Sequence, residues 1–279
     1  MPHIKEIITN LINDEWRQKP TISTGLVELD ELLEGGLRTG KMYVIASRPS
    51  MGKTSLALTI AKNAAIVERK PVAYITTSYD IEKKLLKMPI GKPRTTHIGE
   101  LPKDKLLPML DEIPLWIENI NPLKFHEEVV ELIRDMVNRH GVQIVFVDAL
   151  LKSPKELTTA IQLCQTAKDL DVACAVLCRV SRDADLRVSN EPHLCDILPN
   201  EVCDMADVVM SLFRPEYYEH LRERGEDEWG SIEGRADIIV VKNRMGETGT
   251  ARAYYDKDSS WFFNNKEEQG NNSYKTDPF

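Results

Sequence analysis

The sequence predicts an α/β fold in which helices cover both faces of a mostly parallel sheet. From residue 21 onward, short apolar runs alternate with amphipathic segments, which is the pattern of parallel strands joined by crossover helices. The chain has 279 residues, 42% of them hydrophobic, which suits one large core rather than two. Two late apolar runs on either side of Met245 and Gly246 predict an antiparallel hairpin near the C-terminal end of the domain.

The expected elements fall into three regions, residues 1–20, 21–263 and 264–279. In the first, apolar residues at helical spacing predict an amphipathic helix over 2–17, which packs either on its own domain or on a neighbouring subunit. In the second, strands are expected at 41–47, 71–77, 115–117, 142–148, 172–178, 206–212, 236–241 and 250–255. Helices are expected at 53–68, 124–139 and 155–170, and a loop with helical pieces at 83–108. The third region is polar, and we expect it to be disordered.

Composition restricts the classes of function. The chain carries 36 basic and 44 acidic residues, a net charge of −8, so any contact with nucleic acid must be local. The apolar runs are far shorter than the ~20 residues that span a bilayer, and no signal-peptide pattern follows Met1. Five cysteines without a Cys-x-x-Cys pair indicate neither a disulfide framework nor a zinc site. We therefore expect a cytoplasmic protein without membrane contact.

The segment SRPSMGKTS, residues 47–55, joins an expected strand to an expected helix and matches the phosphate-loop pattern in its last elements. Backbone N–H groups of such a turn and the positive end of the following helix face phosphate groups. We expect Lys53 to reach the β- and γ-phosphates and the Thr54 hydroxyl to ligate Mg²⁺. Ser47 stands where the pattern asks for glycine, a mild departure because a small side chain also permits close approach.

A carboxylate ends the buried run IVFVD, residues 144–148. Open α/β sheets bind ligands at the carboxyl ends of their strands, so Asp148 is expected beside Thr54, where it holds the water shell of a magnesium ion. Many strands end in aspartate, and this one gains its value from the phosphate loop in the same expected sheet. Ala149 follows, so no adjacent glutamate is available as a base.

Two cations stand close together in KNRMG, residues 242–246, at the end of an expected strand. Lys242 and Arg244 are two residues apart, so both side chains leave the same face of an extended chain. They either converge on one anion or form a solvated basic rim on the hairpin. Without other motifs, the rim is the preferred interpretation.

Together these residues resemble the C-terminal motor domain of the DnaB-type replicative DNA helicases, a family of RecA-like P-loop ATPases. The resemblance covers most of residues 20–263, and it includes the segment STGLVELDELLEGGL as well as the late hairpin KNRMGETGTARAYYD. The phosphate loop is more specific than a generic one, because Arg48, Pro49, Ser50 and Met51 match the family too.

The resemblance implies ATP, Mg²⁺, a hexameric ring, single-stranded DNA at its centre, and replication or helicase-loading proteins as partners. It implies a nucleotide site made of Ser47, Arg48, Pro49, Ser50, Met51, Gly52, Lys53, Thr54 and Ser55. Thr54 and Asp148 are the implied metal residues, and Lys242 and Arg244 are implied to reach ATP bound on the next subunit. The chain itself sets no number of subunits.

Departures from the family affect catalysis and DNA contact. Ser78 stands where the family has its catalytic glutamate, and a serine does not act as a base near neutral pH. Asp80 lies on the same face if the strand continues, and is the expected substitute base. Arg179 replaces the family's glutamine sensor, either as an exposed charge or as a third cation near the γ-phosphate. The segment ILPNE, residues 197–201, lacks the arginine and glycine of the family's DNA-contacting segment.

These departures leave three hypotheses open. The first is a DnaB-like ATPase that acts on single-stranded DNA, with hydrolysis slowed because Ser78 replaces the glutamate. The second is a hydrolysis-deficient ATP-binding partner of a helicase or its loader. The third is a RadA-like recombination ATPase, since KNRMG also resembles that family's Lys-Asn-Arg motif; neither a Cys₄ zinc finger nor a protease-like domain accompanies it. We favour the first.

Overall fold

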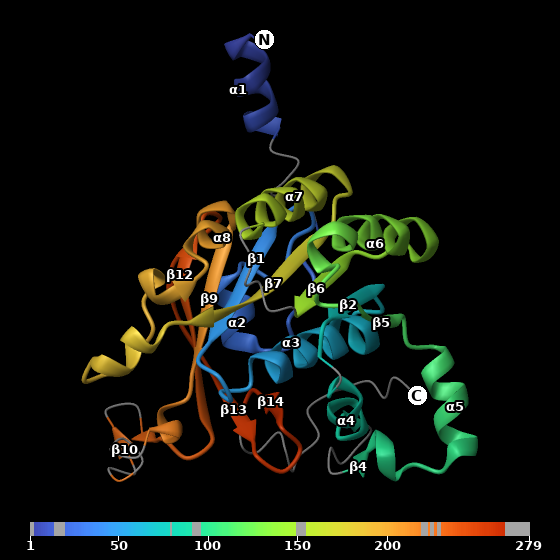
Figure 1. Ribbon diagram of the computed structural model, residues 1–279, viewed down its shortest axis with the longest axis vertical. Coiled ribbons are helices and arrows are strands. Elements are labelled where there is room, and N and C mark those ends of the chain that lie inside the picture. The colour runs from blue at the N-terminus through green and yellow to red at the C-terminus, as the bar shows by residue number, and fades with distance from the viewer. Residues whose placement is uncertain are drawn as a thin grey trace.

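The computed structural model describes residues 3–13, 20–78, 80–90, 96–148, 155–218, 223, 226–227 and 230–265. The predicted α/β fold is confirmed, with a large central sheet between two layers of helices (Figure 1). Within the part of the chain that is described, no helix combines the length and the apolar character that crossing a membrane requires.

The sheet is parallel over most of its width and antiparallel at one side. Its strands lie in the order β14-β13-β12-β9-β1-β7-β6-β2-β5, and β8 pairs with β7. Strands β9 to β5 in this order run parallel, whereas β12, β13 and β14 are antiparallel. Their bounds are β1 Met42–Ser47, β2 Val72–Thr76, β5 Leu115–Asn119, β6 Ile144–Asp148, β7 Ala173–Val180, β8 Ile197–Leu198, β9 Val208–Phe213, β12 Arg235–Asn243, β13 Gly249–Asp256 and β14 Trp261–Phe263. Two small ladders pair β3 (Pro89–Ile90) with β4 (Thr96–His97) and β10 (Glu226–Asp227) with β11 (Gly230–Ser231).

The helices bury one core on each face of the sheet. Along β1 the side chains alternate: Tyr43 and Ile45 enter one core, and Met42, Val44 and Ala46 enter the other. The first core includes α2 and α3, and the second includes α6, α7 and α8. The described helices are α1 Ile4–Asn13, α2 Val27–Leu32, α3 Lys53–Lys62, α4 Ile81–Leu86, α5 Lys103–Asp111, α6 Phe125–His140, α7 Glu156–Asp169 and α8 Asn200–Met205.

Most predicted elements are present within a few residues of their expected bounds. The helix expected over 53–68 is α3 followed by a π-helical turn, Asn63–Val67. The short helices α2 and α8 and the strand β14 were not predicted, because three to six residues are too few to show a period. The predicted disordered tail lies outside the described residues from residue 266 on. Asn264 is ordered, since its side chain accepts a hydrogen bond from the Val27 amide at 2.7 Å.

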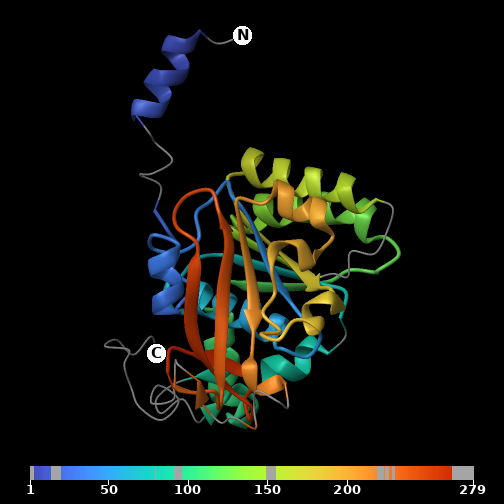
Figure 2. The same ribbon diagram turned by 90° about the vertical axis from the view of Figure 1, so that its left-hand side faces the viewer.

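The N-terminal helix α1 stands apart from the rest of the domain in both views (Figures 1 and 2). The prediction of an amphipathic helix over 2–17 is confirmed for Ile4–Asn13. His3 precedes this helix, and residues 2 and 14–17 lie outside the described part of the chain. Ile4 and Ile8, four residues apart on one side of the helix, are 64% and 47% exposed. These two apolar side chains of the helix are therefore exposed to solvent.

Candidate nucleotide-binding site

The phosphate loop links β1 to α3, and its backbone explains the glycine. Gly52 precedes the helix with a φ of 100°, in a region that only glycine adopts readily. A Cβ atom there would also lie 3.2 Å from the ring of Phe262. The chain therefore turns sharply into α3, and the helix N-terminus faces the end of the sheet.

A cavity of about 360 Å³ opens at this turn. It is lined by Ser47, Arg48, Pro49, Ser50, Gly52, Lys53, Thr54, Ser55, Lys84, Asp148, Arg179 and Tyr255. The cavity thus brings together all the residues predicted to bind nucleotide or metal except Met51, which is fully buried behind the loop. Lys84 and Tyr255 were not predicted, because their approach depends on how α4 and the late hairpin pack.

Thr54 and Asp148 meet at the cavity wall, 94 residues apart in the chain. The Thr54 hydroxyl donates a hydrogen bond to Asp148 Oδ2 at 2.8 Å. The buried Tyr74 hydroxyl donates to the same oxygen at 2.9 Å, and burial followed by the charge of Asp148 raises the pKa of Tyr74. The adjacent hydroxyl and carboxylate are hard oxygen ligands of the kind that Mg²⁺ prefers, so the pair fits that ion. Sequence reasoning missed Tyr74, because a tyrosine inside an apolar strand gives no signal of its hydroxyl partner.

Lys53 reaches into the cavity from the first residue of α3. Burial lowers the pKa of Lys53, and the charge of Asp148 opposes that shift. Arg179, at the end of β7, lines the same cavity and is close enough for its charge to act on Lys53 in the same direction as burial. A desolvated ammonium beside a second cation gains most from an anion placed between them.

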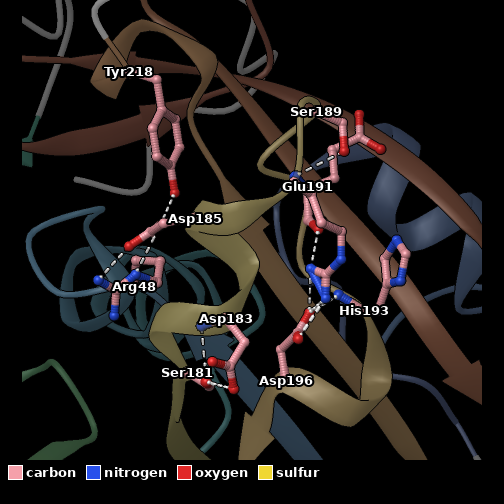
Figure 3. Close-up of polar contacts among 10 residues, drawn as sticks. Arg48, Ser181, Asp183, Asp185, Ser189, Glu191, His193, Asp196 and Tyr218 are labelled. Carbon is pink, nitrogen blue, oxygen red and sulfur yellow. Dashed lines mark hydrogen bonds and ion pairs between the residues drawn. The ribbon is translucent and has the colours of Figure 1, made fainter.

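Arg48 lies beside Asp185, which also contacts Tyr218 (Figure 3). Its guanidinium donates to both carboxylate oxygens of Asp185, at 3.2 and 2.7 Å, and to the Val180 carbonyl at 3.2 Å. The Tyr218 hydroxyl donates to Asp185 at 2.8 Å. The side chain predicted to contact nucleotide therefore also anchors the segment that follows β7.

Asp80 lies outside the cavity. The strand β2 ends at Thr76, so Asp80 does not continue it on the face of Ser78 but precedes α4. Its carboxylate pairs with Lys83 at 2.8 Å, and both side chains are more than 70% exposed. This hydrogen bond lowers the pKa of Asp80. Asp80 therefore has the geometry of a surface ion pair and does not line the cavity.

Lys242 and Arg244 both contact the end of α8, and their predicted contact with a nucleotide of the next subunit stays a prediction. Lys242 Nζ donates to the Cys203 carbonyl at 2.7 Å, and the Arg244 guanidinium donates to the Asp204 carbonyl at 2.8 Å. In the sheet, Asn243 pairs with Val208, whereas Ser47 pairs with Leu212. Four residues of strand separate the two positions by about 13 Å, so the two cations lie at the opposite end of the sheet from their own phosphate loop.

Tyr255 is the one aromatic side chain among the described residues that line the cavity. The guanidinium of Arg214 lies 3.7 Å from the centre of its ring, and Arg214 is itself buried against Glu216. A flat, fixed aromatic wall at the mouth of a phosphate cavity is suited to a nucleobase. Sequence reasoning missed Tyr255, because a single tyrosine in an alternating strand does not indicate a ligand.

The turn, the lysine and the paired threonine and aspartate give this protein the arrangement of a phosphate loop at the edge of a mostly parallel α/β sheet. Residues 21–264 match the family described as the DnaB-like helicase C terminal domain. The chain therefore belongs to that family, in agreement with the resemblance drawn from its motifs.

Curated relatives agree with this assignment. The chain is 28% identical over 289 residues to the replicative DNA helicase DnaB of Rickettsia bellii (strain RML369-C), which covers 87% of this chain and 57% of the relative. It is 29% identical over 257 residues to the replicative DNA helicase DnaB of Leifsonia xyli subsp. xyli (strain CTCB07), covering 84% and 54%. The chain thus spans a little over half the length of these relatives.

Solved structures share the fold. The ATPase domain of G40P superposes with a TM-score of 0.70 at 23% identity, covering 95% of this chain and 100% of that one. A DnaB-like replicative helicase, from a study of its interactions with primase, superposes with a TM-score of 0.69 at 22% identity. The match covers 94% of this chain and 67% of that one. The RadB recombinase superposes with a TM-score of 0.60 at 17% identity, and the match covers 88% of this chain and 100% of that one. The chain therefore shares the fold of these three proteins, and the family match favours the helicase family over the recombination ATPase.

Proposed function

We propose that this protein is an ATP-binding motor domain of the DnaB helicase type, which works in a ring on single-stranded DNA and hydrolyses ATP slowly. The observation that carries the proposal is the 2.8 Å contact between Thr54 and Asp148 in a cavity that also holds Lys53. Phosphates would lie on the N–H groups at the start of α3 and on Lys53, and Tyr255 would pack on the base.

The residues of the site are suited to hold a metal ion, but none of those predicted as a base is placed to act as one. A bound Mg²⁺ would be held by Thr54 and, through its water shell, by Asp148, and it would neutralise charge on the transferring phosphoryl group. Ser78 offers no base, and Asp80 is engaged with Lys83. Slow turnover is the expected result, since loss of a positioned base costs roughly 10² to 10⁴ in rate.

Binding of Mg·ATP to the purified chain tests the proposal. Calorimetry should show saturable binding that Lys53→Ala abolishes. The matched control is Lys83→Ala, which removes an exposed lysine that pairs with Asp80 and does not line the cavity. A wild-type chain that does not bind Mg·ATP, or a Lys53→Ala variant that binds as well as wild type, would contradict the proposal.

The position of Lys242 and Arg244 supports a ring. Because they lie at the far end of the sheet from their own loop, they serve a nucleotide only on a neighbouring subunit. Head-to-tail contacts of this kind close into rings or continue as helical filaments, and the family favours the ring. The exposed apolar side chains of α1, Ile4 and Ile8, would dock on that neighbour. Size measurement with Mg·ATP should show assembly that deletion of residues 1–13 weakens, and a monomer under every condition would rule out the ring.

The alternative of a hydrolysis-deficient partner of a helicase or loader makes a different prediction. Steady-state ATPase measured with and without single-stranded DNA separates the two. Turnover that DNA stimulates and Arg244→Ala removes supports the motor, and binding without turnover supports the partner. Contacts with replication or loading proteins and a cytoplasmic location stay predictions.

A further inference from the structure

The nucleotide cavity contains a second lysine that is not part of the phosphate loop. Lys84, on the short helix α4, lines the cavity together with Lys53 and Asp148. Its ammonium donates a hydrogen bond to the Ser55 hydroxyl at 3.2 Å. Two helices, α3 and α4, therefore each supply one lysine to the same cavity.

The charge balance of the cavity favours an anion beside Lys84. The described lining residues include the cations Arg48, Lys53, Lys84 and Arg179, against the single carboxylate of Asp148. Arg48 is already paired with Asp185. The Ser55 hydroxyl that accepts from Lys84 is neutral, and burial lowers the pKa of Lys84 while the charge of Asp148 opposes the shift. A half-buried ammonium with a neutral partner is stabilised by a negatively charged ligand.

The local fold explains why this lysine points inward. β2 pairs with β6 so that Thr76 lies beside Asp148, and α4 begins soon after β2 ends. Successive helical residues are about 100° apart around the axis, so adjacent lysines on α4 face different ways. Lys83 faces solvent and pairs with Asp80, whereas Lys84 faces the phosphate loop.

We propose that Lys84 is a further phosphate-binding residue, which contacts phosphate oxygens of the nucleotide together with Lys53. An ammonium has three N–H donors, so Lys84 can keep its bond to Ser55 and still donate to phosphate. The proposal rests on the proposed nucleotide binding. It identifies the polyphosphate, rather than the base, as the part of the ligand that Lys84 recognises.

Titration calorimetry on the full chain, with Mg·ATP and with inorganic tripolyphosphate as probes, tests this. Tripolyphosphate has no base, so its affinity reports phosphate contacts alone. Lys84→Gln should weaken both probes by about 10- to 100-fold, as expected for loss of a charged hydrogen bond. Lys84→Arg keeps the charge and should retain most of the affinity. Lys83→Gln, the exposed neighbour on the same helix, should bind as wild type.

Three outcomes would overturn the proposal. The proposal requires Lys84→Gln to bind tripolyphosphate more weakly than wild type, so equal affinity rejects it. Lys84→Arg as weak as Lys84→Gln would mean that the role is structural rather than electrostatic. A wild-type chain that binds neither probe rejects this proposal and the proposed function together, whereas wild-type binding that Lys84→Gln leaves intact rejects only the role of Lys84. Should Lys84→Gln melt early, Lys84→Met, which keeps the apolar stem, replaces it.

Discussion

The guanidinium of Arg48 in the phosphate loop lies 2.7 Å from the carboxylate of Asp185, which follows β7 by five residues. A second anchor joins them, since Tyr218 donates to the same carboxylate. The phosphate loop and the segment after β7 are therefore held by one carboxylate. Loss of this contact is therefore expected to increase the mobility of both segments.

Replacing Asp185 tests this tether. Asp185→Asn should lower the free energy of unfolding by no more than about 1 kcal/mol, because the pair is partly exposed. Hydrogen exchange should nevertheless accelerate in residues 47–53 and 182–190. Asp183→Asn, whose carboxylate accepts from Ser181 rather than from the loop, is the control and should leave residues 47–53 unchanged. Equal exchange in Asp185→Asn and wild type would refute the tether.

Strands were predictable where both faces of the sheet are covered. The run at 144–148 is apolar because β6 lies between two cores, and its final aspartate is found at the carboxyl edge as predicted. Thr54 and Asp148 were paired correctly because parallel strands end at one edge. This part of the site follows from local patterns.

The rest of the site depends on packing that no local pattern records. Lys84 enters the cavity only because α4 turns back toward Ser55, and Tyr255 only because the hairpin folds beside the loop. Asp80 was placed on the face of Ser78 only if the strand continued, and β2 ends at Thr76, so that condition is not met. A shift of one residue in where a strand ends or a helix begins changes which side chain lines the cavity.

Tyr74→Phe probes the buried partner of Asp148. The change deletes one hydroxyl that donates to the carboxylate, while the Thr54 donor remains, so we expect a loss of about 1 kcal/mol in the free energy of unfolding. Urea denaturation measures it. Tyr217→Phe, on a side chain that is 49% exposed, should change nothing. If both variants unfold as wild type does, the bond to Asp148 contributes nothing to stability.

Gly52→Ala tests the shape of the loop. The backbone conformation and a Cβ atom 3.2 Å from Phe262 should together cost about 1–3 kcal/mol, and Mg·ATP binding should weaken because the loop must shift. Gly141→Ala is a matched control: φ is also positive there, but nothing lies within 4 Å of the added Cβ. Equal losses in the two variants would show that crowding at the loop is unimportant.

Mixing experiments test whether Arg244 acts between subunits. Lys53→Ala and Arg244→Ala should each lower ATPase activity strongly when alone. In a mixture, some Arg244→Ala subunits receive an intact arginine from a Lys53→Ala neighbour, so part of the activity should return. Activity in the mixture equal to the average of the two separate preparations would place Arg244 in its own subunit's chemistry or in structure alone, through its bond to the Asp204 carbonyl.

Ser78→Glu should restore a base at the end of β2. Ser78 is exposed, and its backbone carbonyl accepts from Asn119 at 3.2 Å, so a longer side chain has room while the backbone stays fixed. If the missing base limits turnover, kcat should rise by up to roughly 10² to 10⁴, with the KM for ATP little changed. Ser78→Gln has the same length without a carboxylate and should stay at the wild-type rate. Equal rates for the glutamate and glutamine variants would mean that another step, such as assembly or product release, limits the cycle.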